Sequence, residues 1–184
     1  MNNLNKKVKE LAKKVYKKMG GFGWYQEDDL KHALAQELRK AGLPYFQEFV
    51  VPIFYGDQQI KLGEIDFIVF DKKGKNGCLV EIKHAGDLDG SPIHQAMEYY
   101  KAIKEQKCIP SFLKGKIKGV IVFNWNKNSK ALFDSYLEKQ NKKKEEIAFS
   151  VDKPLEGFEP LFKDIEIFEI VGDKKTKKNS KNTS

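Results

Sequence analysis

The sequence predicts an α/β fold in which helices flank a mixed central β-sheet. Two apolar runs of strand length, residues 65–70 and 78–82, are rich in β-branched and aromatic residues and enclose a glycine-containing turn, which predicts a β-hairpin. A third apolar run, residues 116–124, follows an intervening helical pattern. A strand reached through a helix should run parallel to the strand before it, by a right-handed crossover. We therefore expect antiparallel and parallel pairing in one sheet.

Two helices are expected before the hairpin. Residues 2–19 carry apolar residues at helical spacing (Leu4, Val8, Leu11 and Val15), and lysines fill most of the remaining surface. Such a basic amphipathic helix can follow a phosphate backbone, lie on an acidic membrane surface, or pack its apolar stripe on the domain. After the glycine-rich break at residues 20–23, a second stripe ends before Gly42 and Pro44 (Leu30, Leu34, Leu38 and Ala41). Glu27 stands one turn ahead of this stripe, where the helix dipole favours an acidic residue.

Residues 46–55 are expected to form a strand, and Pro52 within it indicates an edge position or a bulge. Gly56 and Asp57 then turn the chain into the hairpin.

The hairpin carries ionisable residues within its apolar runs. Glu81 and Lys83 are two residues apart, so their side chains project to the same face of the strand. If the register brings Asp66 to that face, two carboxylates and a lysine converge, as a hard divalent cation with a bound water would require. The alternative is an edge strand whose polar face lies in water.

The second half of the chain continues the pattern. Ser91 and Pro92 are typical of a helix start, and the helix after them places an apolar stripe on the core, so that Gln95 and Tyr99 share a neighbouring face. Trp125, after the parallel strand, fits either an exposed platform for a base or a cap on the edge of the core. A helix over residues 129–140 and a last strand over residues 164–171 are expected to complete the fold.

Composition narrows the class of partner. The 34 Lys and Arg residues against 26 Asp and Glu give a net charge of +8, which favours a polyanion such as nucleic acid. No apolar run reaches the roughly 18 to 20 residues of a membrane span, and the N-terminus has no apolar signal core, so we expect a cytoplasmic protein without a membrane partner. Cys78 and Cys108 lack the spacing of a disulfide framework or zinc cluster. We expect one domain over residues 1–171 and a disordered lysine-rich tail over residues 172–184.

Asp66, followed by Glu81-Ile82-Lys83, resembles the signature of the PD-(D/E)XK nuclease superfamily, with Ile65 at the position of the motif's proline. The order helix, three strands, helix, strand is similar to that superfamily's restriction-endonuclease-like αβββαβ core. The region from Glu27 to the strand with Glu81 resembles the GxxExxY branch, although Leu30 stands at the position of its tyrosine. Residues 95–99, QAMEY, are similar to the QxxxY motif of RecB-type nucleases.

The resemblance implies a nuclease that hydrolyses phosphodiester bonds, for which we expect DNA as the substrate and Mg²⁺, or Mn²⁺ in its place, as the cofactor. It implies that Asp66, Glu81 and the Ile82 carbonyl bind the metal, with Glu27 acting directly or through water. Lys83 would orient or activate the attacking water, and Gln95 and Tyr99 would support the site. The alternatives are a non-catalytic nucleic-acid-binding module on the same fold and a Holliday-junction or restriction-type endonuclease. A homodimer is compatible with each.

Overall fold

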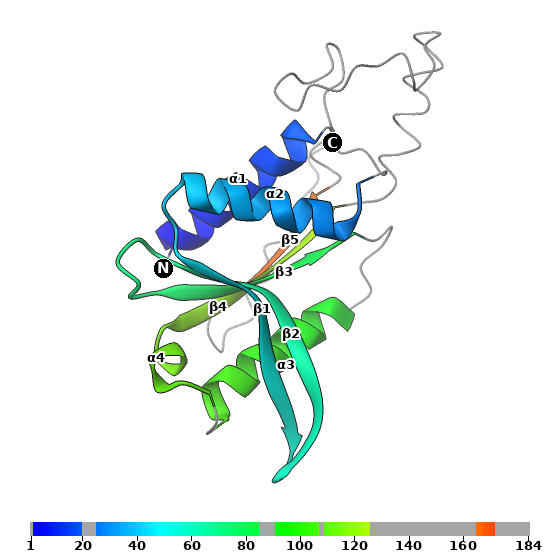
Figure 1. The fold of residues 1–184 in the computed structure, drawn as a ribbon, viewed down its shortest axis with the longest axis vertical. Coiled ribbons are helices and arrows are strands. Elements are labelled where there is room, and N and C mark those ends of the chain that lie inside the picture. The colour runs from blue at the N-terminus through cyan, green and yellow to red at the C-terminus, as the bar shows by residue number, and fades with distance from the viewer. Residues whose placement is uncertain (1, 20–24, 85–90, 107–108, 126–164, 172–184) are drawn as a thin grey trace, which may run out of the picture.

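The computed structural model describes residues 2–19, 25–84, 91–106, 109–125 and 165–171, and confirms the predicted α/β fold (Figure 1). The elements in chain order are the helices α1 (Asn2–Lys18) and α2 (Glu27–Lys40), the strands β1 (Tyr45–Tyr55), β2 (Gln58–Phe70) and β3 (Gly77–Lys83), the helices α3 (Ser91–Glu105) and α4 (Ser111–Lys114), and the strands β4 (Ile117–Trp125) and β5 (Ile165–Val171). The one-turn helix α4 was not predicted. The predicted glycine-rich break, the helix over residues 129–140 and the tail lie outside the described residues.

The sheet has five strands in the order β1-β2-β3-β4-β5. The strands β1, β2 and β3 pair antiparallel, β3 and β4 pair parallel, and β4 and β5 pair antiparallel, so the predicted mixture is confirmed. Pro52 lies in the edge strand β1, and the register shifts between Ile53 and Phe54, which bears out both expectations drawn from the proline.

Helices cover both faces of the sheet, with α1 and α2 on one side and α3 and α4 on the other (Figure 1). Each side has its own apolar core. The first core joins the stripes of α1 and α2 to Phe67, Val80 and Phe123, and the second joins α3 to Ile68, Leu79 and Val122. Neighbouring residues on β2, β3 and β4 therefore pack on opposite faces, as strand geometry requires.

Charged pairs hold α1 to its neighbours. The carboxylate of Glu37 on α2 is buried and lies 2.6 Å from the Nζ of Lys14 and 3.2 Å from the Nζ of Lys18, and these hydrogen bonds hold the pKa of Glu37 below its ordinary value in spite of burial. Lys9 forms an ion pair with Glu169 on β5, and Asn5 donates a hydrogen bond to the same carboxylate at 2.7 Å. Several of the lysines of this helix thus serve the fold, which favours the interpretation that its apolar stripe packs on the domain.

Two residues show where the chain bends. Gly42 adopts a φ of 65° directly after α2, the left-handed conformation in which glycine commonly ends a helix. Glu48 in β1 has a φ of 53°, and the register of β1 and β2 places it opposite Asp66, between the pairs Gln47–Phe67 and Phe49–Ile65. The edge strand is therefore irregular beside the acidic residue of β2.

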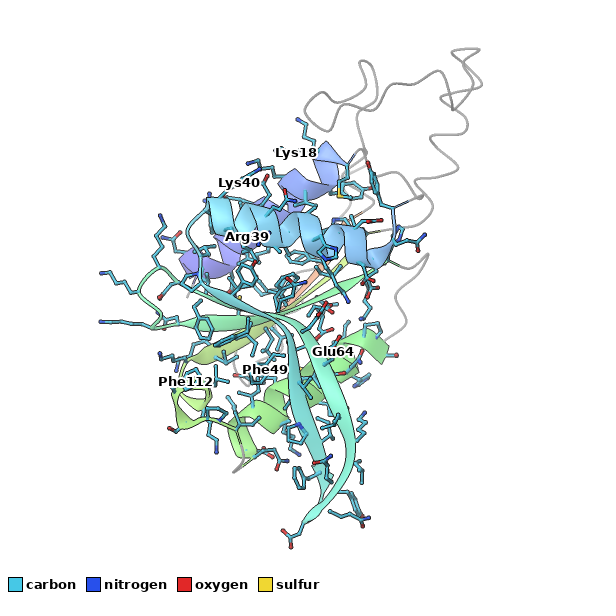
Figure 2. The ribbon with its side chains drawn as sticks, viewed as in Figure 1. Lys18, Arg39, Lys40, Phe49, Glu64 and Phe112 are labelled. Carbon is cyan, nitrogen blue, oxygen red and sulfur yellow. The ribbon has the colours of Figure 1, made fainter. Side chains whose placement is uncertain are left out.

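Side chains of contrasting character lie on the two sides of the sheet. Figure 2 shows Lys18, Arg39 and Lys40 on the side of α1 and α2, whereas Phe49 and Phe112 lie on the side of α3 and α4. Trp125, at the end of β4, is buried and stacks on Phe123, which excludes the exposed platform and confirms the cap on the core. Within the described residues, no helix has the length and apolar character needed to cross a membrane.

Candidate active site

The point where β2 and β3 separate brings two acidic residues together. The antiparallel ladder ends at the pair Phe67–Val80. One further step in the same register places Asp66 opposite Glu81, and residues opposite each other on antiparallel strands project to the same face. Both side chains are buried, with 4% of Asp66 and 2% of Glu81 exposed. The hairpin register therefore joins the two carboxylates as the sequence had suggested.

Both oxygens of the Asp66 carboxylate are bonded. Its Oδ2 accepts a hydrogen bond of 2.7 Å from the backbone N–H of Ile82, a donor that would otherwise be left unpaired where the ladder ends. Its Oδ1 lies 2.8 Å from the Nζ of Lys31 on α2. These two contacts hold the carboxylate in one orientation, between the end of β3 and the first turns of α2.

Glu81 has a different environment, although it is equally buried. Its Oε2 lies 3.7 Å from the Nζ of Lys83, and its Oε1 has no hydrogen-bond partner among the described residues. Burial, together with the charge of Asp66, raises the pKa of Glu81 to about 8, and Lys83 opposes this rise only in part. A buried carboxylate oxygen without a partner is costly, so this atom is suited to an additional ligand.

The first turn of α2 contributes Glu27, a third acidic residue, to the site. Glu27 Oε2 accepts a hydrogen bond of 3.2 Å from the backbone N–H of His84, directly after β3. Its Oε1 lies 3.4 Å from the Nζ of Lys31 and 3.8 Å from the Nζ of Lys83. Glu27 thus links the helix to both lysines of the site, and it is more than a charge that complements the helix dipole.

Lys31 is the residue of this site that the sequence reasoning missed. It contacts Asp66, Glu27 and, at 3.8 Å, Asp28, while only 12% of its side chain is exposed. Burial alone would lower the pKa of its ammonium group, but the hydrogen bond and charge of Asp66 and the nearby Glu27 raise that pKa above its ordinary value. The only sequence signal was its position four residues after Glu27, which places both on one side of a helix.

Gln95 and Tyr99 form a separate pair. The Gln95 amide donates a hydrogen bond of 2.6 Å to the Tyr99 hydroxyl, and the Tyr99 ring lies against Gly63 of β2. Within the described residues, no hydrogen bond or ion pair joins this pair to Asp66 or Glu81. The Tyr99 ring contacts β2 three residues before Asp66, so the pair supports the strand that carries this carboxylate.

The donor atoms of the site fit a hard divalent cation. Within the described ranges, no three His, Cys, Asp or Glu side chains come close enough to form a metal-binding group. Asp66 and Glu81 nevertheless supply adjacent carboxylate oxygens, the kind of ligand that Mg²⁺ and Mn²⁺ prefer, and the Glu81 Oε1 lacks a partner. Two carboxylates completed by backbone oxygen and water are a usual Mg²⁺ environment.

This mixed sheet flanked by helices, with a buried carboxylate pair and a lysine where two central strands separate, is consistent with a restriction-endonuclease-like core. A family model for the PD-(D/E)XK nuclease superfamily matches residues 2–112, and the chain belongs to this superfamily. A search of curated proteins and a search of solved structures gave no match. The superfamily assignment covers α1 through the start of α4 and so includes every residue of the site.

Proposed function

We propose that this protein is a metal-dependent nuclease that hydrolyses phosphodiester bonds in DNA. The observation that carries the proposal is the buried Asp66–Glu81 pair, with a carboxylate oxygen left without a partner and Lys83 beside it. Burying two acidic groups side by side is unfavourable unless a cation compensates them. Membership of a superfamily of nucleases and a net charge of +8 support nucleic acid as the substrate.

Each side chain has a definite task in this proposal. Asp66, Glu81 and the Ile82 carbonyl would hold Mg²⁺, or Mn²⁺ in its place, and Glu27 would contribute through water or directly. The bound cation supplies electrostatic stabilisation for the phosphate and lowers the pKa of a water molecule. Lys83, whose Nζ lies 3.7 Å from Glu81 and 3.8 Å from Glu27, would orient the attacking water and stabilise negative charge on the phosphate.

Gln95 and Tyr99 would support β2 rather than act on the metal, because the two side chains are hydrogen-bonded to each other and the Tyr99 ring lies against Gly63. We further propose that the chain belongs to the GxxExxY branch with a RecB-like QxxxY helix. A single catalytic domain over residues 1–171, a cytoplasmic location and a homodimer remain parts of the same proposal.

The second candidate function is a nucleic-acid-binding module that no longer cleaves. The ion pair between Lys31 and Asp66 favours it, since a cationic side chain already compensates one of the two acidic groups. Against it stands Glu81, whose Oε1 that ion pair does not reach. A Holliday-junction or restriction-type endonuclease differs from the main proposal only in the shape of the DNA it cuts.

The test is a cleavage panel of single-stranded, duplex and branched DNA and of RNA, each with Mg²⁺, Mn²⁺ or Ca²⁺, for the wild type and Glu81→Ala. We expect the wild type to cut DNA with Mg²⁺ and Mn²⁺ but not with Ca²⁺, whose looser coordination misplaces the water. Glu81→Ala should not cut, yet should bind DNA at least as tightly, because a negative charge beside the phosphate is removed. Binding without cleavage by the wild type on every substrate would establish the binding module instead.

A further inference from the structure

Lys31 contacts the oxygen of Asp66 that is not hydrogen-bonded to the backbone of β3. Its Nζ is 2.8 Å from Asp66 Oδ1, and the other oxygen of that carboxylate already accepts the N–H of Ile82. A cation that binds Oδ1 must therefore share it with the ammonium group or displace it. The same Nζ also lies 3.4 Å from Glu27, the third acidic residue near the site.

The ion pair between Lys31 and Asp66 is largely buried and has several supporting contacts, so a metal ion would have to compete with it for Asp66. Lys31 extends from the second turn of a regular helix, its side chain is largely buried, and three carboxylates lie within 4 Å of its ammonium group. Lys83, by contrast, comes no closer than 3.7 Å to any carboxylate in the described part of the chain. Of the two lysines, Lys31 thus neutralises the acidic cluster in the metal-free protein.

We propose that Lys31 is an internal counter-ion that holds the carboxylates together without metal and must leave Asp66 when the metal binds, so that it lowers the affinity for the cation. The inference rests on the proposed metal site. Lys31 is a positioning residue in this role, because it acts on the site through Asp66 and Glu27. Its departure would also free an ammonium group at the rim of the site, next to the place where a phosphate would lie.

Two consequences distinguish this role from a merely structural one. Without Lys31, the metal-free protein retains a buried Asp66 carboxylate that has lost its ion-pair partner, so it should be less stable. The metal should then bind more tightly and stabilise the protein more, since a ligand that binds only the folded state raises its stability according to its affinity. A lysine that merely orients Asp66 for the metal would give the opposite change in affinity.

The experiment measures Mn²⁺ binding by electron paramagnetic resonance of the free ion, and thermal unfolding in EDTA and in saturating Mn²⁺. The variants are Lys31→Met, which keeps the length of the side chain, Lys31→Arg, which keeps the charge, and Lys40→Met. Lys40 is a matched control on the same helix, because its side chain is 64% exposed and its nearest carboxylate is Glu37, at 3.9 Å. None of these measurements depends on cleavage.

We expect Lys31→Met to bind Mn²⁺ at least about tenfold more tightly than the wild type, because the metal no longer has to break the ion pair between Lys31 and Asp66. The interaction of two opposite charges a few ångströms apart near a protein surface is worth more than a tenfold change in affinity. Its melting temperature should be lower in EDTA and should rise more on adding Mn²⁺. Lys31→Arg and Lys40→Met should remain near the wild type. Equal or weaker Mn²⁺ binding by Lys31→Met would overturn the inference.

The same measurements distinguish a wrong metal site from a wrong role for Lys31. If the wild type binds no Mn²⁺ and Glu81→Ala does not alter that result, the metal site itself is wrong. If Lys31→Met does not fold in EDTA, its folding yield and affinity in Mn²⁺ still decide the question: recovery of the fold by Mn²⁺ supports the counter-ion, and no recovery contradicts it.

Discussion

At the scale of single residues, the two carboxylates of the site are buried to the same degree but differ in their bonds. Asp66 is compensated on both oxygens, by Ile82 and Lys31, whereas Glu81 has one oxygen 3.7 Å from Lys83 and one without a partner. The two carboxylates therefore differ in their hydrogen bonds and ion pairs even without metal. Asp66 is fixed in position, and Glu81 is the carboxyl group whose ionisation is unfavourable.

The raised pKa of Glu81 gives a prediction for stability against pH. Its pKa is about 8 in the folded protein and near the ordinary 4.5 in the unfolded chain, so the folded state holds the extra proton between these values. Stability without metal should therefore fall as the pH rises from 4.5 to about 8.

Urea unfolding in EDTA at several pH values measures this dependence. Glu81→Gln cannot ionise and should lose that part of the slope, so the wild type and the variant should differ most at pH 8. Parallel curves for the two proteins would show that Glu81 is already ionised in the folded state. Saturating Mn²⁺ should reduce the wild-type slope, because a cation favours the ionised carboxylate.

Glu27 gives the second prediction at this scale. Glu27→Gln keeps the shape of the side chain but removes the charge that lies near Lys31 and Lys83. Metal affinity and cleavage rate should fall together by about tenfold, the usual scale for losing a ligand or its direct support. Raising Mn²⁺ should restore part of the rate, because Mn²⁺ binds oxygen-rich sites more tightly than Mg²⁺.

The check is a metal titration of the cleavage rate for the wild type and Glu27→Gln side by side. Glu10→Gln on α1 is a suitable control, because that carboxylate is half exposed and, in the part of the chain that the structure describes, pairs with Lys7 alone. Superimposed titrations of the wild type and Glu27→Gln would limit Glu27 to its contact with His84 and leave Asp66 and Glu81 as the only carboxylate ligands.

At the scale of elements, α3 positions β2 against the rest of the sheet. The Tyr99 ring lies on Gly63, where an added Cβ would be 2.3 Å from the Cε1 of the ring. Lys61 on the same strand pairs with Glu98 on α3 at 2.8 Å. This side of β2 is therefore held by a close packing contact and an ion pair, just before the strand reaches Asp66.

Gly63→Ala should consequently displace Tyr99 and strain the Gln95–Tyr99 hydrogen bond. We expect a loss of about 1 to 3 kcal/mol in the free energy of unfolding, the usual range for overpacking in a core. Gly115→Ala is the control, since a Cβ there meets no atom within 4 Å and Gly115 has a negative φ of −81°.

Urea unfolding of both variants measures the difference, and the double variant Gly63→Ala with Tyr99→Ala tests its cause. Because the truncated ring can no longer clash with the new methyl group, the two changes together should cost less than the sum of the single changes. Strict additivity would mean that the methyl group acts on something other than Tyr99.

At the scale of the whole molecule, the positive charge is divided between lysines that pair within the fold and lysines that follow the last strand in the sequence. Three lysines of α1 form internal pairs with Glu37 and Glu169, so the other lysines and arginines carry most of the net charge of +8. Residues 173–184 contain five lysines and one aspartate. A large share of the positive charge therefore lies beyond the last strand of the sheet.

Deleting residues 173–184 should lower DNA affinity evenly across sequences and reduce the dependence of binding on salt, while cleavage at saturating substrate stays unchanged. Fluorescence anisotropy at several salt concentrations checks this expectation. A variant with the five lysines replaced by glutamine separates the effect of charge from that of length. An identical salt dependence for the full and truncated chains would show that the tail does not contact the substrate.

Apart from α4, the described elements and their order were predicted from the sequence, because periodicity is a local property. The stripe ahead of Gly42, the alternation around Glu81 and the proline of the edge strand each depend on residues within one element, and the structure bears them out. Whether Asp66 shares a face with Glu81 was left open by the sequence, and the pairing of β2 with β3 places the two residues opposite each other.

The way in which these carboxylates are compensated depends on the packing of distant elements. Lys31 is 35 positions before Asp66, and Glu27 is 57 positions before His84, so their contacts depend on how α2 packs across the end of the sheet. Periodicity within α2 shows which residues share a side of the helix, but not which strand end that side meets. Side-chain contacts over such separations form only when the whole core is assembled, and for that reason the internal cation of this site could not be predicted from sequence.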